Sequence, residues 1–399
     1  MNQGRTARLA DLVKFVGGGT PTRNNPDYFG GDIPWVTPKD MKSWGIERAQ
    51  VNITDAGLAG SAARLVPAGS VLVVVRSGVL KHTLPVGVSR VPVAINQDMK
   101  AVLCGREIHP DYLARLIKAN SSLILSWVRA TTADNFPVEK LKEMRVSLPS
   151  VEEQRRIAEI LDRADELRSK RREALAQLDE LARSIFLDTF GDPVRNEHSW
   201  PRAPMGSLLS RIHSGHSPQC LSRPASQSEW GVLKLSAITS CEFLAKENKA
   251  LPVGVAPKLE HAVKVGDLLF SRKNTRDLVG ACALVRETPS NLLLPDLIFR
   301  LELNPDAAIN KVFLQQLLVY PSKRRQIQLL ASGSAGSMPN ISKASLMVAE
   351  VEVPPLALQQ EFARQIEAIE ELRAAQRASL AELDALFASL QDRAFRRLL

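Results

Sequence analysis

The chain has 399 residues, of which 45% are hydrophobic and 24% charged, and a formal net charge of +9. This composition argues against a disordered chain, and no apolar run approaches the ~18 residues of a membrane-spanning helix. The start of the chain lacks the apolar region of a secretory signal, so we expect a cytoplasmic location. The four cysteines show no CxxC spacing, which argues against a zinc site or a disulfide framework.

The positive charge is unevenly distributed along the chain. Residues 150–190 contain eight Lys/Arg against ten Asp/Glu, and residues 356–399 contain six against seven. These two stretches sum to −3, so the remainder of the chain carries +12. A basic remainder beside two stretches of mixed sign is typical of globular parts that touch a polyanion and of helices that touch protein.

Residues 1–148 are predicted to form a first globular domain that mixes helices and strands. An amphipathic segment at Leu9–Phe15 is followed by the cluster Gly17–Pro21, which predicts a turn because glycine allows positive φ and proline ends helices. A short strand that runs into a polar loop is expected at Asp32–Met41, and a β-branched strand at Pro67–Val75.

The second half of this domain continues the mixed pattern. The strand at Pro67–Val75 should lead into an exposed loop that begins at Arg76 and carries Lys81 and His82. A further strand is predicted at Val86–Ile95 and a helix at residues 110–128.

A long amphipathic helix is predicted for residues 149–190. Apolar residues recur at spacings of three and four from Ile157 to Phe186, which places them on one face of a helix. Gly191-Asp192-Pro193 should end the helix, because glycine accepts a left-handed cap and proline cannot continue a helix. At ~1.5 Å per residue, roughly 38 residues reach about 57 Å, which is more than one globular domain needs. We therefore expect this helix to separate two domains.

Residues 191–353 repeat the plan of the first domain. Ser214–Pro218 corresponds to the turn cluster Gly17–Pro21 at an offset of 197 residues, and Gly266–Leu269 corresponds to Gly69–Leu72 at the same offset. The two modules share few residues, as expected of domains that keep a scaffold and change what it recognises.

A second long helix is predicted for residues 354–399, with the apolar phase of the first. Phe362 follows Ile157 by 205 residues, and the same offset relates Leu383 to Leu178. Two such helices most simply pack on each other, because each covers the apolar stripe of the other; the alternative is that each docks separately on its own domain. The residues expected to pack between the helices are Ile157, Leu161, Leu178, Leu181, Ile185, Phe362, Ile366, Leu383, Leu386 and Leu390.

No catalytic or metal centre is predicted. The stretch Asn25–Tyr28 differs from the NPPY motif of amino-methyltransferases in having Asp27, and no glycine-rich cofactor loop precedes it. The chain has no GxxxxGK phosphate loop, so we expect no ATPase activity. His213 and His216 lie three residues apart in a turn without a third ligand, which favours a surface or phosphate-contacting pair over a metal site.

The motifs at the ends of the first helix are specific. The sequence LPSVEEQRRI opens it at residues 148–157, and GDP ends it at residues 191–193. Together with the duplication, these motifs resemble the specificity subunit of a Type I restriction-modification system over essentially the whole chain. The second helix departs from the pattern, because Ala357-Leu358 stand where the first helix has Glu152-Glu153.

The resemblance implies an α+β fold with two repeated mixed α/β target-recognition domains, joined and separated by two long antiparallel coiled-coil helices. Each domain would read one half of a bipartite site on double-stranded DNA, while the helices would set the spacing and dock two methyltransferase subunits. Restriction/translocase subunits would complete the complex. The chain itself would be non-catalytic, with S-adenosylmethionine, ATP and Mg bound by the partner subunits.

Loop side chains that can hydrogen-bond base edges or phosphates are the candidate DNA contacts. Arg offers a fork to guanine, Asn to adenine, and Lys a point charge to phosphate. The run from Arg272 to Arg276 is the strongest candidate, because three cations and an amide follow a strand without an intervening acid. For every member, ordinary solvated surface is the alternative. The full set is Thr37, Lys39, Arg76, Ser77, Lys81 and His82 in the first domain and Lys234, Ser236, Arg272, Lys273, Asn274 and Arg276 in the second.

Two functions of other classes remain open. A stand-alone sequence-specific DNA-binding regulator would bind its site without partner subunits. A coiled-coil scaffold that binds no nucleic acid would not need the +12 that is confined to the globular parts.

Overall fold

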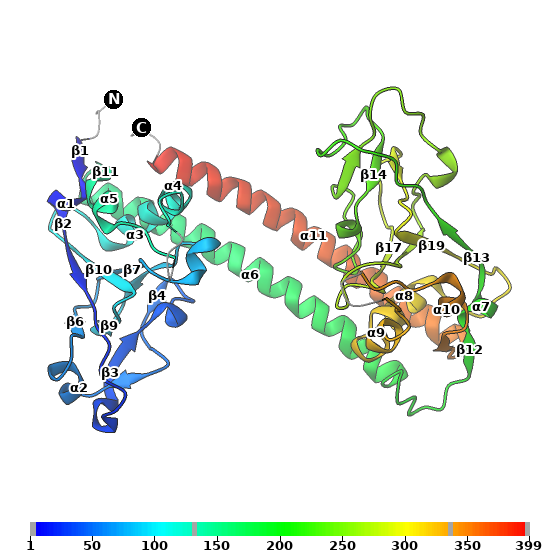
Figure 1. Ribbon diagram of the computed structural model, residues 1–399, viewed down its shortest axis with the longest axis horizontal. Coiled ribbons are helices and arrows are strands. Elements are labelled where there is room, and N and C mark those ends of the chain that lie inside the picture. Colours follow the sequence, from blue (N-terminus) through cyan, green and yellow to red (C-terminus); the bar gives the residue numbers. More distant parts are fainter. Residues whose placement is uncertain (1–4, 130–133, 334–337, 396–399) are drawn as a thin grey trace. The chain divides into compact units, whose positions relative to one another are not determined.

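The computed structural model of the protein describes residues 5–129, 134–333 and 338–395. The chain divides into two compact units, one formed by residues 1–172 and 378–399 and the other by residues 173–377. Two helices of 40 residues each, α6 (Val151–Phe190) and α11 (Leu356–Phe395), contribute one half to each unit (Figure 1). The predicted ranges extend to residues 1–4 and 396–399, which lie outside the described residues, and the domain boundaries at 148 and 353 stay a prediction.

The first unit contains two mixed sheets and a short antiparallel pair. The larger sheet has the order β2-β10-β7-β8-β4, the second has the order β5-β3-β9-β6, and β1 pairs with β11. The strands are β1 (Arg5–Arg8), β2 (Val13–Gly17), β3 (Phe29–Val36), β4 (Gly45–Ile46), β5 (Asn52–Ile53), β6 (Arg64–Val66), β7 (Val71–Val74), β8 (Val86–Ser89), β9 (Val93–Ile95), β10 (Met99–Cys104) and β11 (Arg145–Leu148). The helices are α1 (Leu9–Leu12), α2 (Asp55–Ala59), α3 (Pro110–Ala119), α4 (Ser121–Leu125) and α5 (Val138–Glu143), with 3-10 turns η1 (Pro26–Tyr28), η2 (Pro38–Asp40) and η3 (Gly78–Lys81).

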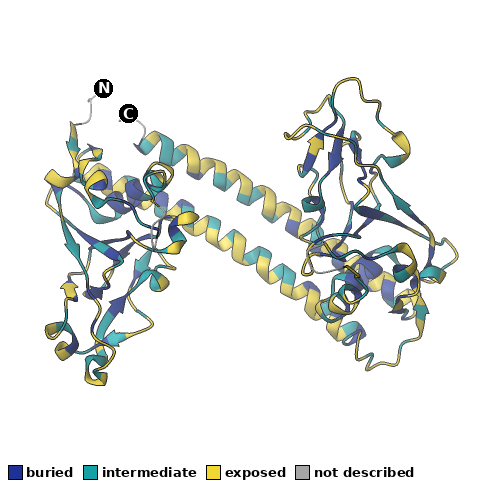
Figure 2. Ribbon diagram, in the orientation of Figure 1, coloured by how far each residue is buried: buried dark blue, intermediate teal, exposed yellow. Residues whose placement is uncertain are grey.

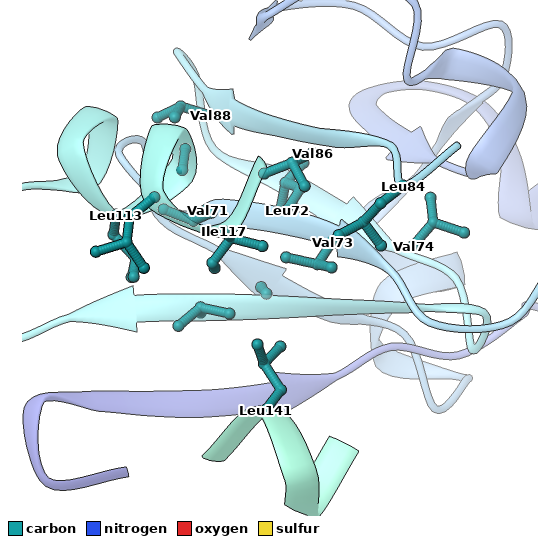
Figure 3. Close-up of a cluster of buried hydrophobic side chains, with 14 of the residues drawn as sticks. Val71, Leu72, Val73, Val74, Leu84, Val86, Val88, Leu113, Ile117 and Leu141 are labelled. Atoms are coloured by element: carbon teal, nitrogen blue, oxygen red, sulfur yellow. The ribbon is translucent and has the colours of Figure 1, made fainter. Parts of the chain in front are cut away.

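The core of the first unit forms where α3 covers the central strands. All four residues of β7 and of β8 are buried, which fits their unbroken apolar and small-residue sequence. Leu113 and Ile117 are one turn apart on α3 and lie beside Val71 and Val73 of β7 (Figure 3). The strands therefore present one buried layer, and the helix closes it.

Three element predictions for the first unit were too coarse. The predicted strand Val86–Ile95 is two strands in different sheets, because Pro92 between them lacks the N–H that would continue a ladder. The predicted helix 110–128 divides at Asn120, whose side-chain amide donates to the Leu116 carbonyl oxygen at 2.9 Å and competes with the helical ladder. The segment Leu9–Phe15 is one helical turn, α1, that runs directly into β2.

The second unit has a four-stranded sheet in the order β13-β19-β16-β17, a three-stranded sheet in the order β15-β14-β18, and the pair β12-β20. The strands are β12 (Arg202–Pro204), β13 (Leu209–Ser214), β14 (Gly231–Leu233), β15 (Asn248–Ala250), β16 (Leu268–Ser271), β17 (Cys282–Leu284), β18 (Leu292–Leu293), β19 (Ile298–Leu303) and β20 (Glu350–Glu352). The helices are α7 (Met205–Leu208), α8 (Lys311–Val319), α9 (Pro321–Gln328) and α10 (Lys343–Met347), with 3-10 turns η4 (Leu235–Ala237) and η5 (Leu259–His261). No helix of the described residues is long and apolar enough to cross a membrane.

The predicted turn clusters occupy the same place in both units. A Cβ added to Gly18 would lie 2.0 Å from the Ile95 carbonyl oxygen, and one added to Gly215 would lie 1.8 Å from that of Leu294. Both distances are far below van der Waals contact, so only glycine fits where these loops cross a neighbouring strand end. The sequence offset between Gly18 and Gly215 is 197 residues, as the repeat predicts.

The helices α6 and α11 pack together in an antiparallel manner, which confirms the predicted fold class. In the first unit, Leu161 from the early part of α6 and Phe387 from the late part of α11 belong to one core. In the second unit, Phe186 near the end of α6 lies edge-on to Phe362 near the start of α11, with ring centroids 5.6 Å apart. Each unit thus contains opposite ends of the two helices, and a part of their apolar residues is buried in its core (Figure 2).

Two of the residues predicted to pack between the helices do not. Leu181 and Leu386 are 46% and 50% exposed, whereas the adjacent Ala182 and Phe387 are buried. The error has a geometric cause, since an apolar stripe at 3.6 residues per turn drifts around a long helix and the outer leucines leave the packed face. Ile157, Leu178, Ile185 and Leu390 are partly buried against the cores, and Leu161, Phe362 and Ile366 are fully buried; Leu383 is of intermediate burial.

A buried glutamine fastens the start of each long helix to its unit. The Gln154 amide oxygen accepts from the His109 N–H at 2.7 Å, and its nitrogen donates to the carbonyl oxygens of Glu107 and Pro149 at 2.9 Å each. Both the oxygen and the nitrogen of the Gln154 side-chain amide are therefore hydrogen-bonded, and the glutamine links α6 to the turn that precedes α3.

The same bonds recur 205 residues later. The Gln359 oxygen accepts from the Asn310 N–H at 2.8 Å, and its nitrogen donates to Ala308 and Pro354 at 3.1 and 2.7 Å. Gln154 and Gln359 are both completely buried. The repeat therefore extends from sequence to individual hydrogen bonds.

Positions 186 and 391 are equivalent in the repeat but differ in packing, and this difference gives the first prediction. Phe186 is buried and stacks on Tyr320 at 4.8 Å, whereas Gln391 lines a cavity of about 910 Å³. We expect Phe186→Ala to lower the free energy of unfolding by about 3–5 kcal/mol and Gln391→Ala by less than about 1 kcal/mol. Chemical denaturation of both variants measures these free energies. A loss for Phe186→Ala as small as that for Gln391→Ala would show that the Phe186 ring does not stabilise the second unit.

Candidate nucleic-acid interface

The loop after β7 is held by a backbone frame. The Ser77 N–H donates to the Asp134 carbonyl oxygen at 2.9 Å, and the Phe136 N–H donates to that of Val75 at 3.3 Å. Arg76 and Asn135 form an isolated β-bridge between these two bonds. The loop that carries the predicted DNA contacts therefore leaves the sheet from a fixed base.

The loop after β16 is held by the same frame. The Asn274 N–H donates to the Pro339 carbonyl oxygen at 3.3 Å, and the Ile341 N–H donates to that of Arg272 at 2.7 Å. Lys273 and Asn340 form the bridge. Residues 272–274 of the β16 loop follow residues 75–77 by 197, and residues 339–341 follow residues 134–136 by 205. Identical backbone bonds thus support different side chains.

Most predicted contacts of the first loop are exposed and have acidic neighbours. Arg76 pairs with Asp98 at 2.6 Å, and Lys81 lies 3.7 Å from Asp134. The Ser77 hydroxyl accepts from the Val79 N–H at 3.4 Å and caps η3, at whose end His82 is exposed. The carboxylates of both pairs are largely buried, whereas the Arg76 and Lys81 side chains are 49% and 64% exposed, so both cations face solvent where a polyanion can reach them.

Thr37 and Lys39 belong to a second loop that faces the first. Thr37 accepts and donates within a capping box with Asp40, whose carboxylate lies 2.7 Å from the Thr37 hydroxyl. Thr37 therefore has a structural role at η2, while Lys39 is exposed. Lys39 and Ser77 line a common pocket of about 560 Å³. The other residues around it are Pro38, Met41, Lys42, Ser43, Trp44, Val79, Thr83, Pro85, Val86, Lys118 and Asp165.

Lys118 gives this pocket a half-buried cation that the sequence did not reveal. Its ammonium donates to the Leu84 carbonyl oxygen at 2.8 Å and to the Thr83 hydroxyl at 3.3 Å. Burial lowers the pKa of Lys118, and the nearby Asp165 carboxylate opposes that shift. With Lys39 and Lys42 exposed beside it, the pocket is a cationic hollow with apolar walls.

The strongest predicted cluster, residues 272–276, divides between the interior and the surface. The Arg272 guanidinium donates to the Asn340 side chain at 3.1 Å and lies 5.2 Å from the centre of the Phe299 ring. Asn274 is only 6% exposed, so reading a base edge with its amide requires the loop to open. Arg276 is exposed, and Lys273 is half-buried. Among the cations of this cluster, only Arg276 is exposed without a rearrangement of the loop.

Lys234 and Ser236 converge on one carboxylate. Glu247 lies 2.7 Å from the Lys234 ammonium and 2.5 Å from the Ser236 hydroxyl. These two bonds lower the pKa of Glu247, chiefly through Lys234, so the carboxylate remains charged and offsets the lysine. A polyanion that binds here has to compete with Glu247, which the sequence analysis did not single out.

The residues that sequence reasoning missed differ in how they could have been found. Lys42 follows Lys39 by three residues in the same polar loop, and this proximity could have added it to the candidates. Lys118 and Trp44 reach the pocket from α3 and from another loop, and no local pattern marks them.

No metal centre is apparent in the part of the chain that the structure describes. No group of three or more His, Cys, Asp or Glu side chains there could hold an ion. His213 instead lies with Nε2 2.8 Å from the Glu302 carboxylate, an interaction that lowers the pKa of Glu302. A hydrogen bond between His213 and Glu302 accounts for this pair without a metal.

Residues 4–177 match the family model described as the Type I restriction modification DNA specificity domain. The specificity subunit of the Type I restriction enzyme EcoR124I/EcoR124II of Escherichia coli is 36% identical over 181 residues, or 45% of each chain. That of the enzyme MjaIX of Methanocaldococcus jannaschii is 27% identical over 235 residues, or 53% of each chain. The chain thus spans about half the length of these curated relatives.

Solved structures share the fold over almost the whole chain. The S subunit of a Type I restriction-modification system from M. genitalium has a TM-score of 0.62 at 13% identity and covers 99% of this chain and 97% of its own. A chain from a study of complex assembly and conformational transition of the type I R-M system has a TM-score of 0.51 at 20% identity and covers 98% and 97%. These structures share the fold of this chain, and the family model and the curated relatives support the resemblance that the sequence motifs indicate.

The geometry predicts where a polyanion gains its charge contacts. We expect Lys42→Ala and Arg276→Ala each to lower the salt concentration at which the protein elutes from heparin, because each removes an exposed cation beside a candidate loop. Lys170→Ala is the matched control, since Lys170 is an exposed α6 lysine paired with Glu166 at 2.7 Å. An equal shift for all three variants would mean that the column senses net charge alone.

Proposed function

We propose that this chain is the non-catalytic DNA-specificity subunit of a Type I restriction-modification complex. Each globular part reads one half of a bipartite site on double-stranded DNA. The observation that carries the proposal is the repeated backbone frame under the β7 and β16 loops, where equal hydrogen bonds hold Ser77 in one unit and Asn274 in the other. A constant frame with variable side chains suits two modules that read different bases.

The paired helices set the distance between the half-sites and dock the methyltransferase subunits. Exposed leucines recur at the repeat offset on both helices, Leu167 with Leu372 and Leu181 with Leu386. Single exposed leucines need no explanation, but two matched pairs favour a partner that binds twice. Two methyltransferase subunits per chain follow from this repetition.

The chemistry belongs to the partner subunits. S-adenosylmethionine bound by the methyltransferase subunits would supply the methyl group, and ATP and Mg would serve the restriction/translocase subunits. The deciding experiment is to map methylated motifs across the genome of a host that expresses this chain with its methyltransferase subunit. A bipartite motif that disappears with this chain supports the proposal, whereas methylation by the purified chain alone contradicts it.

A stand-alone DNA-binding regulator is the alternative function. Such a protein would bind its site tightly without partners, and a gel shift with the purified chain against the mapped motif separates the two. The exposed leucine pairs favour the subunit, because a regulator would have no use for them.

The two arginines of the β16 loop should behave differently. Arg276→Ala should weaken binding about equally on all sequences and reduce the slope of log K against log salt by about one, as for a phosphate contact. Arg272→Ala should cost about 1–3 kcal/mol at one base pair of the second half-site only, if Arg272 leaves Asn340 to read a guanine. Competition titrations on single-base variants of the site measure both. A uniform loss for Arg272→Ala would make it a second phosphate contact.

Lengthening both helices together tests their role as a spacer. Four residues inserted after Arg172 and four after Arg377, which are 205 residues apart, keep the helix pairing in phase. They add ~6 Å and turn each helix by about 40°. Because DNA rises ~3.4 Å per base pair and turns once in about 10, the preferred spacer should grow by one or two base pairs.

Seven-residue insertions at the same places should be less well tolerated. Seven residues turn each helix by almost two full turns, so the far domain keeps nearly its original rotation. The three base pairs that match the added length rotate the far half-site by about 100°, so the domain and its half-site no longer face each other. Methylation of a random-spacer library followed by sequencing measures the outcome. An unchanged spacer with full activity would leave the helices only a docking role.

A further inference from the structure

Within the first unit, the arginine Arg115 joins the recognition domain to α6. The Arg115 side chain on α3 is 5% exposed and lies 2.7 Å from Asp162 and 3.0 Å from Asp165, both on α6. Its guanidinium also stacks over the Trp44 ring at 3.8 Å, and Trp44 lines the cationic pocket. One side chain therefore touches the recognition surface and the long helix together.

The contacts continue from α6 to α11. Asp165 also pairs with Arg168 at 2.9 Å, and Arg168 reaches Asp384 on α11 at 2.6 Å while lying over the Phe387 ring at 4.2 Å. The result is a continuous series of ion pairs from Arg115 on α3 to α6 and α11. Planar guanidinium groups with two partners each fix orientation as well as distance.

The second unit contains the same helix-to-helix pairs. Glu370, Arg373 and Asp179 are the repeat counterparts of Asp165, Arg168 and Asp384, each at an offset of 205. Arg373 pairs with Glu370, and it reaches Asp179 at 2.6 Å. The cross-helix part of the network is therefore duplicated without change of pattern.

The arginine from the recognition domain is not duplicated, and a different residue takes its place. Gln316 stands at the position equivalent to Arg115, at the offset of 201 residues that also relates His109 before α3 to Asn310 before α8. Arg286, which follows β17, instead lies 3.8 Å from Glu370. Two unrelated positions thus supply an arginine to the equivalent carboxylates Asp165 and Glu370. Such an arrangement indicates a shared requirement and not a remnant of the duplication.

We propose that Arg115 and Arg286 are positioning residues that fix each recognition domain on the helix pair and so determine how strictly the spacer length is read. This inference rests on the proposed function. If a domain can rock on its helices, its half-site can be met at more than one spacing, because one base pair shifts the target by ~3.4 Å and about 36°. Arg115 is buried and bonds two acids, whereas the Arg286 contact is long and one-third exposed. The first domain should therefore be held more rigidly than the second.

The test measures spacing and half-site sequence separately. The full chain is co-expressed with its methyltransferase subunit and a library in which both half-sites are kept and the spacer varies. For Arg115→Met, which keeps the stem and removes the charges, we expect unchanged half-site bases and about tenfold more methylation at spacers one base pair too long or short. Arg115→Lys should restore part of the discrimination, since it keeps the charge without the fork. Lys170→Met is the matched control and should leave the spacer distribution as in the wild type.

Each outcome decides between the alternatives. An unchanged spacer distribution in a folded Arg115→Met protein would overturn the inference. If Arg115→Met does not fold, Arg286→Met decides in its place, because that side chain is partly exposed and its removal opens no core; no broadening there overturns the inference. Failure of the wild-type chain to direct methylation to any bipartite site would instead refute the proposed function.

Discussion

The burial of the ends of both long helices is the constraint on which the rest of the structure depends. The first unit is not a continuous stretch of chain, because the end of α11 completes a core that is otherwise built from residues before 173. The second unit is continuous, and the end of α6 and the start of α11, at its two chain ends, complete its core. Phe387 and Phe395 close the first core although they lie more than 200 residues from most of it, and Ala182 and Phe186 help to close the second from α6. Contacts so distant in sequence carry a large entropic cost of closure, which the apolar area buried along the helices offsets.

Hydrogen bonds from two glutamines satisfy the buried backbone groups at the points where α6 and α11 begin. A chain that enters a helix against a sheet exposes backbone groups that have no partner inside the protein. Gln154 and Gln359 satisfy three such groups each, and a glutamine side chain is long enough to reach them from the first turn. An apolar residue there would leave a buried N–H and two carbonyl oxygens unpaired. The helices are thus attached by directional bonds as well as by packing.

The two units share a backbone framework but differ in the charges around the loops that it supports. Around the β7 loop of the first unit, Lys39, Lys42 and Lys118 surround an open pocket. In the second unit, the Glu247 carboxylate pairs with Lys234 of the corresponding loop, and Glu242 pairs with Arg377 of α11. The first domain therefore offers a hollow with three lysines, whereas the lysine of the second domain's loop is neutralised by a carboxylate. A chain whose halves read different sequences would be expected to differ in this way.

The sequence by itself determined the duplication and the two long helices, because apolar periodicity, the positions of glycine and proline, and the repeat offsets can all be read along the chain without coordinates. It also located the loops after the two central strands. Tertiary structure alone decided which side chains in those loops are free, since Asn274 is buried and Arg272 is held by Asn340 from a distant segment. It likewise brought Lys118, Trp44 and Asp165 into one pocket and turned Leu181 and Leu386 outward. A one-dimensional pattern carries spacing along the chain, whereas burial and charge pairing depend on residues that folding brings from elsewhere.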